Sequence, residues 1–480
     1  MAILIIGSGL TGLSTAHYLK KKGIPFLVLE KGKTPGGVIK TSSENGFIYE
    51  LGPNTGVIGS IEIAELFEDL NGLCELETAN EKAQKRYILK NGKWEALPSG
   101  LIEGIKTPLF TTKDKFRLLG EPFRSKGNDL HETLAALVKR RMGQSFLDYA
   151  IDPFIKGVYA GDPETLIPKY ALPKLYNLEQ NYGSFIGGAI KKQFEKKTDA
   201  DKKITRKIFS AKGGLTNLTQ ALYQNAGKEN FLFNVSGLKV EITENPDASK
   251  TQQSFSNHND SLAGSLSKYK NVSPFLYKAH WSANGKMENI IARNIVFTGA
   301  SFELPHIFPF IDQGELAKIT NLYYAKIIEV TLGFKEWKGI PLDGFGGLIP
   351  SKEKRDLLGI LYMSTLFNDR APEGGALLTV FMGGVKNENI TRLPDDEIKK
   401  VVEQEISSLL GLSVFKPDLF KITRYDHAIP QYEVSSGERF KTIEKLEQQY
   451  PGLILGGNMR DGIGMADRAR QGKMLTRQVI

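Results

Sequence analysis

The first thirty residues consist of two short apolar runs separated by one amphipathic run. Residues 2–6 are wholly apolar, as in a strand buried on both faces, and residues 13–23 place apolar side chains at helical spacing among polar ones. A second apolar run, residues 24–29, ends at Glu30. This order predicts a strand, a helix and a second strand, the βαβ unit that opens a parallel sheet.

Later segments show both strand and helix patterns. Residues 87–98 predict two short strands around Asn91-Gly92, because this dipeptide favours the tight turn of a hairpin. From residue 112 to residue 194 apolar residues recur at helical spacing, which predicts a separate helical lobe. The remaining patterns predict a turn and a helix over 209–227, strands within 230–242, a strand after residue 290, strands over 322–334, 359–365 and 376–384, a helix over 394–410, and a closing strand, glycine-rich turn and helix over 451–475.

Two polar segments interrupt these patterns. Residues 244–270 are low in apolar content, which predicts a long, mobile hairpin loop. Residues 190–207 hold the densest group of lysines, with acids between them. We interpret this second segment first as the solvated end of a helix, and second as a peripheral contact with an anionic membrane surface, the cytoplasmic membrane.

Composition narrows the class of protein. Of the 480 residues, 41% are hydrophobic and 24% charged, and no run approaches the roughly 18 apolar residues that a membrane helix needs. The first strand begins at residue 2 without a charged leader, and Cys74 is the only cysteine. We therefore expect a cytoplasmic protein with no disulfide and no cysteine metal site, in which Cys74 is a small buried hydrophobe.

The charge balance leaves several partners open. Lysine and arginine number 63 against 54 acids, an excess of nine positive charges. This excess suits an acidic substrate, an anionic surface or simple solubility. No motif supports nucleic-acid binding, and the six histidines, including His427, show no metal-ligand spacing, so no metal site is expected. The sequence leaves open whether the protein forms a homodimer.

The loop after the first strand reads GSGLTG and carries candidate nucleotide chemistry. Gly7 permits a tight turn, Gly9 lets the backbone approach a pyrophosphate, and Gly12 allows close packing of helix on strand. The phosphates are expected at the helix N-terminus, where free N–H groups favour anions. Glu30, about 20 residues further on, is expected to accept the ribose hydroxyls.

Three features favour FAD over NAD. A glycine doublet, Gly36-Gly37, follows the acid, and a short strand over residues 47–51 leads into Gly52-Pro53. The closing turn, with Gly462 and Gly464 before a helix, would bring backbone N–H groups to a flavin ring. No second GxGxxG is present, which argues against a nicotinamide-fed monooxygenase, and the tail lacks Cys and His, so the flavin is expected to be non-covalent.

Four blocks together resemble the protoporphyrinogen and coproporphyrinogen oxidases of haem synthesis, which belong to the flavin amine-oxidase superfamily. The blocks are GSGLTG to GPNTG, PFIKGVYAGDPETL (153–166), the stretch from DGFGGLIP to FMGG (343–384), and AIPQY (428–432) with the tail GNMRDGIGMADRARQG. They span nearly the whole chain. The resemblance implies an α/β fold (α+β overall) in three parts. These are a Rossmann-like FAD-binding domain (1–80, 205–300 and 430–480), a mixed-sheet substrate-binding domain (81–110 and 301–429), and a helical domain (111–204) linked in relatives to membrane association.

The resemblance also assigns residues to two sites. For FAD it implies Gly7, Ser8, Gly9, Leu10, Thr11, Gly12, Glu30, Lys31, Gly36, Gly37, Val38, Gly52, Pro53, Asn54, Thr55, Val235, Asn458, Ile463, Gly464 and Met465. For the substrate it implies Arg86 at a propionate and Phe345, Gly346, Leu348 and Phe381 around the tetrapyrrole.

The implied reaction is aromatisation of a porphyrinogen. Six electrons leave in three flavin cycles, each a hydride passing from a meso carbon, and O2 reoxidises the flavin to give H2O2. Because the cofactor carries the redox step, the protein is expected to bind the substrate, orient it and shield it from water. No acid-base residue is assigned. The sequence leaves open which porphyrinogen is the substrate.

Two other interpretations remain at this stage. Lys326 stands where amine oxidases carry a lysine near the flavin, so an amine oxidase or a carotenoid desaturase of the same superfamily is the alternative; equally, Lys326 is a strand lysine that reaches solvent. A flavin-free binding protein that kept the fold is the third, since fold does not fix function.

Overall fold

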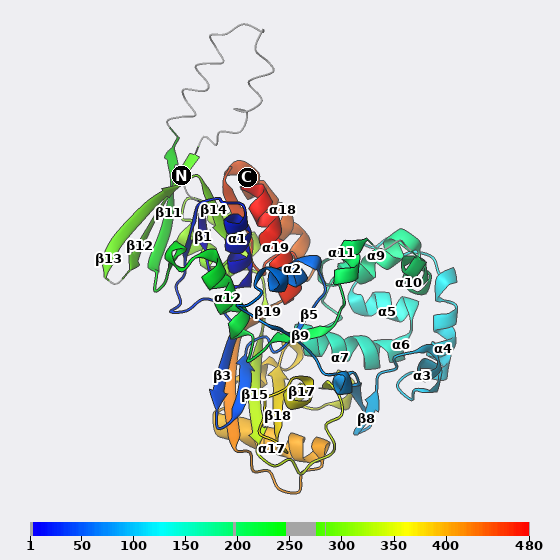
Figure 1. Cartoon of the computed structure of the whole chain (residues 1–480). Coiled ribbons are helices and arrows are strands. Elements are labelled where there is room, and N and C mark those ends of the chain that lie inside the picture. Colours follow the sequence, from blue (N-terminus) through cyan, green and yellow to red (C-terminus); the bar gives the residue numbers. More distant parts are fainter. Residues whose placement is uncertain (1–2, 195–197, 246–274, 284, 480) are drawn as a thin grey trace.

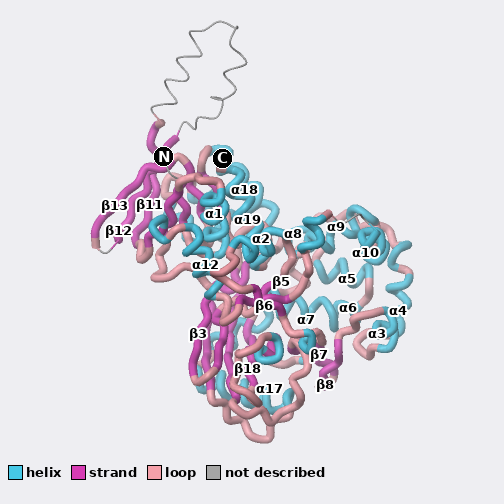
Figure 2. The backbone as a smooth tube through the Cα atoms, in the orientation of Figure 1, coloured by secondary structure: helices cyan, strands magenta, loops and turns pink. Residues whose placement is uncertain are grey.

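The computed structural model describes residues 3–194, 198–245, 275–283 and 285–479. Figure 1 shows three regions: one around a parallel sheet near both chain ends, one around a larger sheet, and one made of helices. Figure 2 shows that the first region combines strands and helices, that strands dominate the second and helices the third. The predicted loop over 244–270 lies outside the described residues except for its first two positions.

The parallel sheet confirms the predicted βαβ opening and the α/β class. Its order is β10-β2-β1-β14-β20, and every neighbouring pair is parallel. Alternate residues of β1 face opposite cores, with Ile3 and Ile5 on one side and Leu4 and Ile6 on the other. The strands are β1 (Ile3–Ile6), β2 (Phe26–Leu29), β10 (Phe231–Leu232), β14 (Asn294–Phe297) and β20 (Leu453–Leu455), and helices α1 (Leu10–Lys21), α2 (Ile61–Asp69), α12 (Thr216–Ala226), α18 (Ser436–Gln449) and α19 (Met465–Gln478) belong to the same region.

The first and last long helices of the chain pack against each other (Figure 1). At their crossing, a Cβ on Gly472 would lie 2.5 Å from the Ser14 Cβ and 2.8 Å from the Thr15 amide nitrogen. Only glycine allows the two backbones to approach this closely. The N-terminal unit is therefore covered by the C-terminal helix.

Smaller sheets flank the parallel one. The antiparallel sheet β11-β12-β13 was not predicted, since β13 is mostly exposed and lacks a clear apolar face. The segment predicted as a turn and a helix over 209–227 begins instead with the end of a strand, because β9 pairs with β5 and β6. The strands are β11 (Ser236–Glu244), β12 (Phe275–Ala283), β13 (Lys286–Ala292), β3 (Lys40–Glu44), β4 (Phe47–Leu51), β5 (Gly56–Val57), β6 (Leu76–Thr78) and β9 (Ile208–Ala211).

The larger sheet is mixed, in the order β19-β15-β18-β17-β16-β7-β8, with only β16 and β7 parallel. The predicted hairpin is confirmed, with positive φ at Asn91 and Gly92. The strand predicted over 359–365 ends at Tyr362, because α16 follows. The elements are β7 (Arg86–Lys90), β8 (Lys93–Ala96), β15 (Tyr324–Phe334), β16 (Gly346–Leu348), β17 (Leu357–Tyr362), β18 (Ala376–Gly383), β19 (Leu419–Pro430), α16 (Met363–Leu366) and α17 (Asp395–Leu410), whose apolar side packs on one face of the sheet. Helices α14 (Leu304–Ile307) and α15 (Gln313–Thr320) pack instead against the core of the parallel sheet.

The helices found between residues 112 and 194 confirm the helical pattern predicted there. It contains a buried charge network in which the Arg141 guanidinium meets Glu121 at 2.9 Å and Glu179 at 2.6 Å. Paired charges of this kind are tolerated inside a protein because each satisfies the other. The helices are α3 (Leu101–Lys106), α4 (Thr112–Leu119), α5 (Leu134–Arg141), α6 (Gln144–Phe146), α7 (Asp152–Phe154), α8 (Pro168–Ala171), α9 (Pro173–Tyr182), α10 (Phe185–Phe194) and α11 (Asp199–Lys203), with π-helical turns over Leu147–Ile151 and Ile155–Tyr159.

Candidate active site

The carboxyl ends of the parallel strands form one edge, and loops rich in glycine leave it. Gly7 follows β1, Glu30 follows β2, Thr298 follows β14 and Gly456 follows β20. The Thr298 hydroxyl lies 3.0 Å from the Ile6 carbonyl and 3.1 Å from the Gly7 carbonyl, which joins two of these loops. In open α/β sheets, ligands bind in the crevice at this edge.

The GSGLTG loop is shaped for close approach by a ligand. Gly7 has φ +99°, and a Cβ on Gly12 would lie 2.0 Å from the Gly7 carbonyl oxygen, so neither position accepts a side chain. A Cβ on Gly9 would meet no atom within 4 Å, although Gly9 caps the N-terminus of α1. An open glycine at a helix N-terminus fits the pyrophosphate of a dinucleotide.

Glu30 is buried and already bonded at this edge. One of its carboxylate oxygens accepts from the backbone N–H and the hydroxyl of Ser8, and the other accepts from the Gly32 N–H at 2.7 Å. The Val235 N–H donates to the Glu30 carbonyl, so these two predicted residues are neighbours. The Lys31 ammonium lies elsewhere, in an ion pair with Glu303.

The glycine doublet packs against the same loop. The Gly36 N–H donates to the Ser8 carbonyl at 2.9 Å, and a Cβ on Gly37 would lie 3.3 Å from the Gly9 Cα. Val38 follows with an exposed side chain, and a Cβ on Gly52 would lie 2.3 Å from the Val38 carbonyl oxygen. The structure thus brings the predicted residues 7–12, 36–38 and 52 into one continuous surface.

The turn after β4 is held by a residue that the sequence analysis did not single out, Glu329 of β15. Its carboxylate accepts from the Gly52 N–H at 3.1 Å and from the Asn54 side-chain amide at 2.7 Å. The Thr379 hydroxyl donates to the Asn54 side-chain oxygen at 2.8 Å. Burial raises the pKa of Glu329 to about 7. The available signal was one acid within the apolar strand run at residues 324–334.

The closing loop contains the last group of predicted cofactor residues. The Tyr324 hydroxyl lies 3.1 Å from the side-chain oxygen of Asn458, and the Tyr432 hydroxyl donates to the Asn458 carbonyl at 2.9 Å. The buried Arg468 guanidinium donates to the carbonyls of residues 457, 460 and 462. Burial lowers the pKa of Arg468. These buried groups fix the loop that leads to Gly464, the residue that caps α19.

This closing loop meets the other cofactor segments. A Cβ on Gly457 would lie 2.8 Å from the Gly299 carbonyl at the sheet edge. A Cβ on Gly56, one residue after the predicted Pro53–Thr55 segment, would lie 2.7 Å from the Met465 methyl group. Ile463 instead packs against the hydrophobic cluster of the helical region. Most of the predicted cofactor residues therefore come together from separated parts of the sequence.

The predicted substrate residues lie on the mixed sheet. The exposed Arg86 guanidinium lies 5.7 Å from the centre of the Phe345 ring, and Arg86 pairs with Gly346 across β7 and β16. Leu348, Gly359 and Phe381 form one row across three strands, and Glu329 is next in that row. Leu348 contacts the helical region, where a Cβ on Gly157 would lie 2.3 Å from it.

Lys326 has a defined partner. Its ammonium lies 3.0 Å from the Glu388 carboxylate, in the 3₁₀ segment Val385–Arg392, and the Tyr323 hydroxyl donates to the same carboxylate. This acid satisfies the Lys326 charge at a partly exposed position. The His427 ring stacks near Phe302, at 4.4 Å between ring centres.

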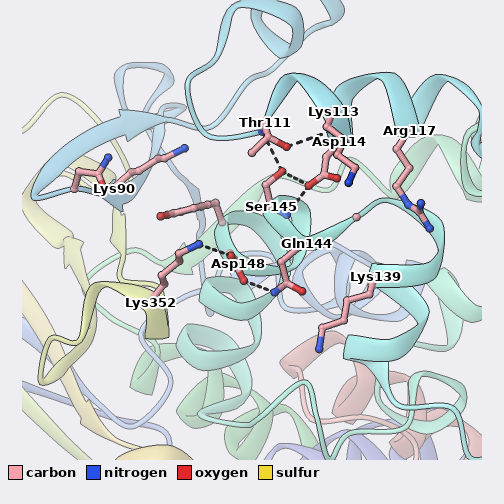
Figure 3. Close-up of a pocket in the computed structure, with 13 residues that line it drawn as sticks. Lys90, Thr111, Lys113, Asp114, Arg117, Lys139, Gln144, Ser145, Asp148 and Lys352 are labelled. Carbon is pink, nitrogen blue, oxygen red and sulfur yellow. Dashed lines mark hydrogen bonds and ion pairs between the residues drawn. The ribbon is translucent and has the colours of Figure 1, made fainter.

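A hollow lies apart from this candidate site. Figure 3 shows it between the turn of the β7–β8 hairpin and helices α4 and α6, and its volume is about 700 Å³. Asp114 and Asp148 at its wall are already bonded, to Ser145 and to Lys352 and Gln144. None of the predicted cofactor or substrate residues lines it. Its basic members are Lys90, Lys113, Arg117, Lys139 and Lys352.

The described residues contain neither a candidate metal centre nor a helix that could span a membrane. No group of three or more histidine, cysteine or acidic residues there is arranged to hold a metal ion. Over the same ranges, no helix has the length and hydropathy to cross a bilayer.

The chain is similar to known proteins over nearly its whole length. The chain is 30% identical to protoporphyrinogen oxidase 2, chloroplastic/mitochondrial, of Arabidopsis thaliana, over 98% of this chain and 92% of the relative. It is 27% identical to coproporphyrinogen III oxidase of Bacillus subtilis, over 98% and 96%. A crystal structure from Exiguobacterium sp. 255-15, provisionally assigned as a protoporphyrinogen oxidase, shares the fold, with a TM-score of 0.76 at 21% identity, over 100% of this chain and 98% of that one.

One family accounts for these similarities. Residues 10–479 match the family described as flavin containing amine oxidoreductase, which is nearly the whole chain. This protein is therefore a flavin oxidoreductase and belongs to the flavin-containing amine oxidoreductase family.

Proposed function

We propose that this protein is an FAD-dependent oxidase that converts a porphyrinogen to a porphyrin in haem biosynthesis, with O2 as the acceptor and H2O2 as the second product. The observation that carries the proposal is the row of Leu348, Phe381 and Glu329 on the mixed sheet. It runs from the predicted substrate residues to the turn that holds Gly52 and Asn54. Relatives of this chain include proteins named protoporphyrinogen oxidase and coproporphyrinogen III oxidase.

The protein's own residues would hold the cofactor in two ways. The N-terminus of α1 at Gly9 would receive the pyrophosphate, and Glu30 with Val235 would border the adenosine half. The loop from Asn458 to Met465 and the turn from Gly52 to Thr55 would border the ring. When bound, FAD supplies a two-electron acceptor.

The substrate face matches a large apolar ring with acidic arms. Phe345, Leu348 and Phe381 are half-buried, so each keeps apolar surface for a ligand. Arg86 is exposed and lies over Phe345, where its guanidinium could pair with a propionate. In this proposal the protein orients the ring and excludes water, as expected when the cofactor carries the redox step.

The test is a porphyrin fluorescence assay. FAD-loaded protein is given protoporphyrinogen and coproporphyrinogen separately under air, and H2O2 is measured in parallel. Three H2O2 per porphyrin formed would support the proposal, and the faster substrate would identify the branch. No porphyrin from either substrate with the flavin intact, together with oxidation of amines, would contradict it.

We also propose that the helical region contacts a membrane surface peripherally. Five apolar side chains in consecutive elements are each at least 66% exposed: Ile102, Ile105, Phe116, Leu119 and Phe123. Exposed apolar patches of this kind mark interaction surfaces. The basic hollow of Figure 3 shares helix α4 with Phe116 and Leu119, and its lysines suit anionic headgroups.

A further inference from the structure

A buried acid links the two halves of the candidate site. Glu329 is 1% exposed, and it lies in the middle of β15, the second strand of the mixed sheet. We propose that Glu329 is a positioning residue for the flavin, because its carboxylate holds the turn at Gly52 and Asn54 against the substrate face of the sheet. The inference rests on the proposed function only in taking that turn as part of the flavin site.

The first step of the argument is the hydrogen-bond geometry. Gly52 has φ +104°, a conformation that favours glycine, and its N–H points to one Glu329 oxygen. The Asn54 amide donates to the other oxygen and also to the Gly52 carbonyl at 3.0 Å. A carboxylate can accept both donors at once; without it the Gly52 N–H would lose its acceptor and the buried Asn54 amide would lose one of its two.

The second step fixes the direction of the Asn54 amide. The Thr379 hydroxyl donates to the Asn54 oxygen, so the Asn54 nitrogen must face Glu329. Thr379 and Phe381 lie two residues apart on β18 and share one face of the sheet, and Phe381 lies directly opposite Glu329 on the neighbouring strand. The chain of contacts thus runs from the predicted substrate residue Phe381, through Glu329 and Asn54, to the predicted cofactor turn.

The third step is electrostatic. Within the described ranges, no lysine or arginine forms an ion pair with Glu329; the charged and titratable groups that face it are Glu50, from β4, and Tyr425, from β19. Glu50 in turn pairs with the buried Arg370. Burying a carboxylate without a cation costs more than burying an amide of the same size. Packing alone therefore does not explain an acid at position 329, whereas its hydrogen bonds to the turn at Gly52 and Asn54 do.

The test measures FAD binding without any porphyrinogen. Apo-protein is titrated with FAD by flavin fluorescence and absorbance for wild type, Glu329→Gln and Glu405→Gln. Glu405 is a matched control, since it is a buried acid of α17 on the opposite face of the same sheet, bonded to Arg355. We expect Glu329→Gln to weaken FAD binding at least about tenfold and to shift the flavin absorption spectrum, while Glu405→Gln does neither.

A reciprocal exchange separates a specific contact from general damage. In Glu329→Gln combined with Asn54→Asp, the amide and the carboxylate change places, and we expect partial recovery of FAD affinity over Glu329→Gln alone. Should Glu329→Gln not fold, Thr379→Val removes only the outer hydrogen bond, and we expect it to weaken FAD binding in the same direction. Unchanged affinity and spectrum in the folded Glu329→Gln protein, or in Thr379→Val where that is the protein measured, would overturn the inference.

The outcome is independent of the substrate. If wild type binds FAD but oxidises no porphyrinogen, the proposed function fails while this comparison still decides the role of Glu329. If Glu329→Gln merely lowers the melting temperature to the same extent as Glu405→Gln, with FAD affinity intact, the carboxylate braces the fold and the inference is wrong.

Discussion

The carboxylate of Glu30 accepts both the backbone N–H and the hydroxyl of Ser8, each at 2.7 Å. This contact ties the end of β2 to the loop after β1 and holds the acid in one orientation at the sheet edge. Its other oxygen accepts the Gly32 N–H. A ribose hydroxyl that donates to Glu30 must therefore share an acid that the protein has already positioned.

The change Glu30→Gln should reduce FAD affinity by at least about tenfold, because it removes the charge from a hydrogen bond to the ribose. Glu65→Gln is the control, because this acid of α2 is paired with Lys473 at 2.7 Å and belongs to neither predicted site; it should leave FAD affinity unchanged. Fluorescence titration with FAD measures the affinity of both variants, and thermal melting measures their stability. Equal FAD affinity in wild type and Glu30→Gln would show that Glu30 does not bind the ribose.

Gly9 and Gly12 should respond differently to the same added methyl group. In Gly9→Ala the new Cβ meets no protein atom within 4 Å, so the apo-protein should melt like wild type while FAD binding weakens. In Gly12→Ala the Cβ would lie 2.0 Å from a carbonyl oxygen, so the melting temperature should fall as well. Thermal melts with and without FAD distinguish the cases. A Gly9→Ala protein with normal affinity would argue against phosphates at this helix N-terminus.

Arg86→Ala should raise KM about tenfold or more while changing kcat much less. A propionate anchor remote from the reacting carbon binds ground state and transition state alike. Lys85→Ala is the neighbouring control, because that lysine is already paired with Asp343 at 2.6 Å. Steady-state kinetics on both porphyrinogens provide the measurement. An unchanged KM for both would remove Arg86 from the substrate site.

Glu329 should make stability depend on pH. Burial raises its pKa from 4.5 to about 7, so between these values the folded protein keeps a proton that the unfolded chain has released. The contribution of Glu329 is therefore fully present below pH 4.5 and is lost as pH rises through 7, by about 3 kcal/mol in all. The melting temperature of Glu329→Gln relative to wild type should rise between pH 5 and pH 8. A constant difference at both values would contradict the raised pKa.

The paired change Phe116→Glu with Leu119→Glu should abolish binding to anionic vesicles. These residues lie three apart on α4 and therefore share one face of the helix. Met287→Glu is the control, an equally exposed apolar residue on β13. Co-sedimentation with vesicles containing phosphatidylserine measures the effect. Equal sedimentation of the paired variant and wild type would place the membrane contact elsewhere or exclude it.

Local patterns made much of the fold predictable. The βαβ unit, the hairpin at Asn91-Gly92 and the closing strand and helix each depend on residues close in sequence, so spacing alone predicted them. Strands β12 and β13 were missed because the exposed positions of β13 blur the alternation, and β19 was missed because its partner β15 lies far away in the sequence.

The candidate site divides in the same way. Gly9, Glu30 and the glycine doublet follow from a local fingerprint, and the structure places them together. Glu329 was not predicted because its role depends on a partner 275 residues away. The ion pair of Lys326 with Glu388 could not be predicted either, because nothing in the local sequence around either residue indicates the other as its partner.

The crossing at Gly472 makes the packing of the βαβ unit depend on a distant part of the sequence. Helix α1 packs against α12 and α19, and β1 pairs with β14, which lies almost 300 residues further along the chain. The two halves of the candidate cofactor cradle therefore meet only after contacts of very long sequence separation have formed, and such contacts slow folding. Loss of α19 would leave the face of α1 around Ser14 and Thr15 uncovered.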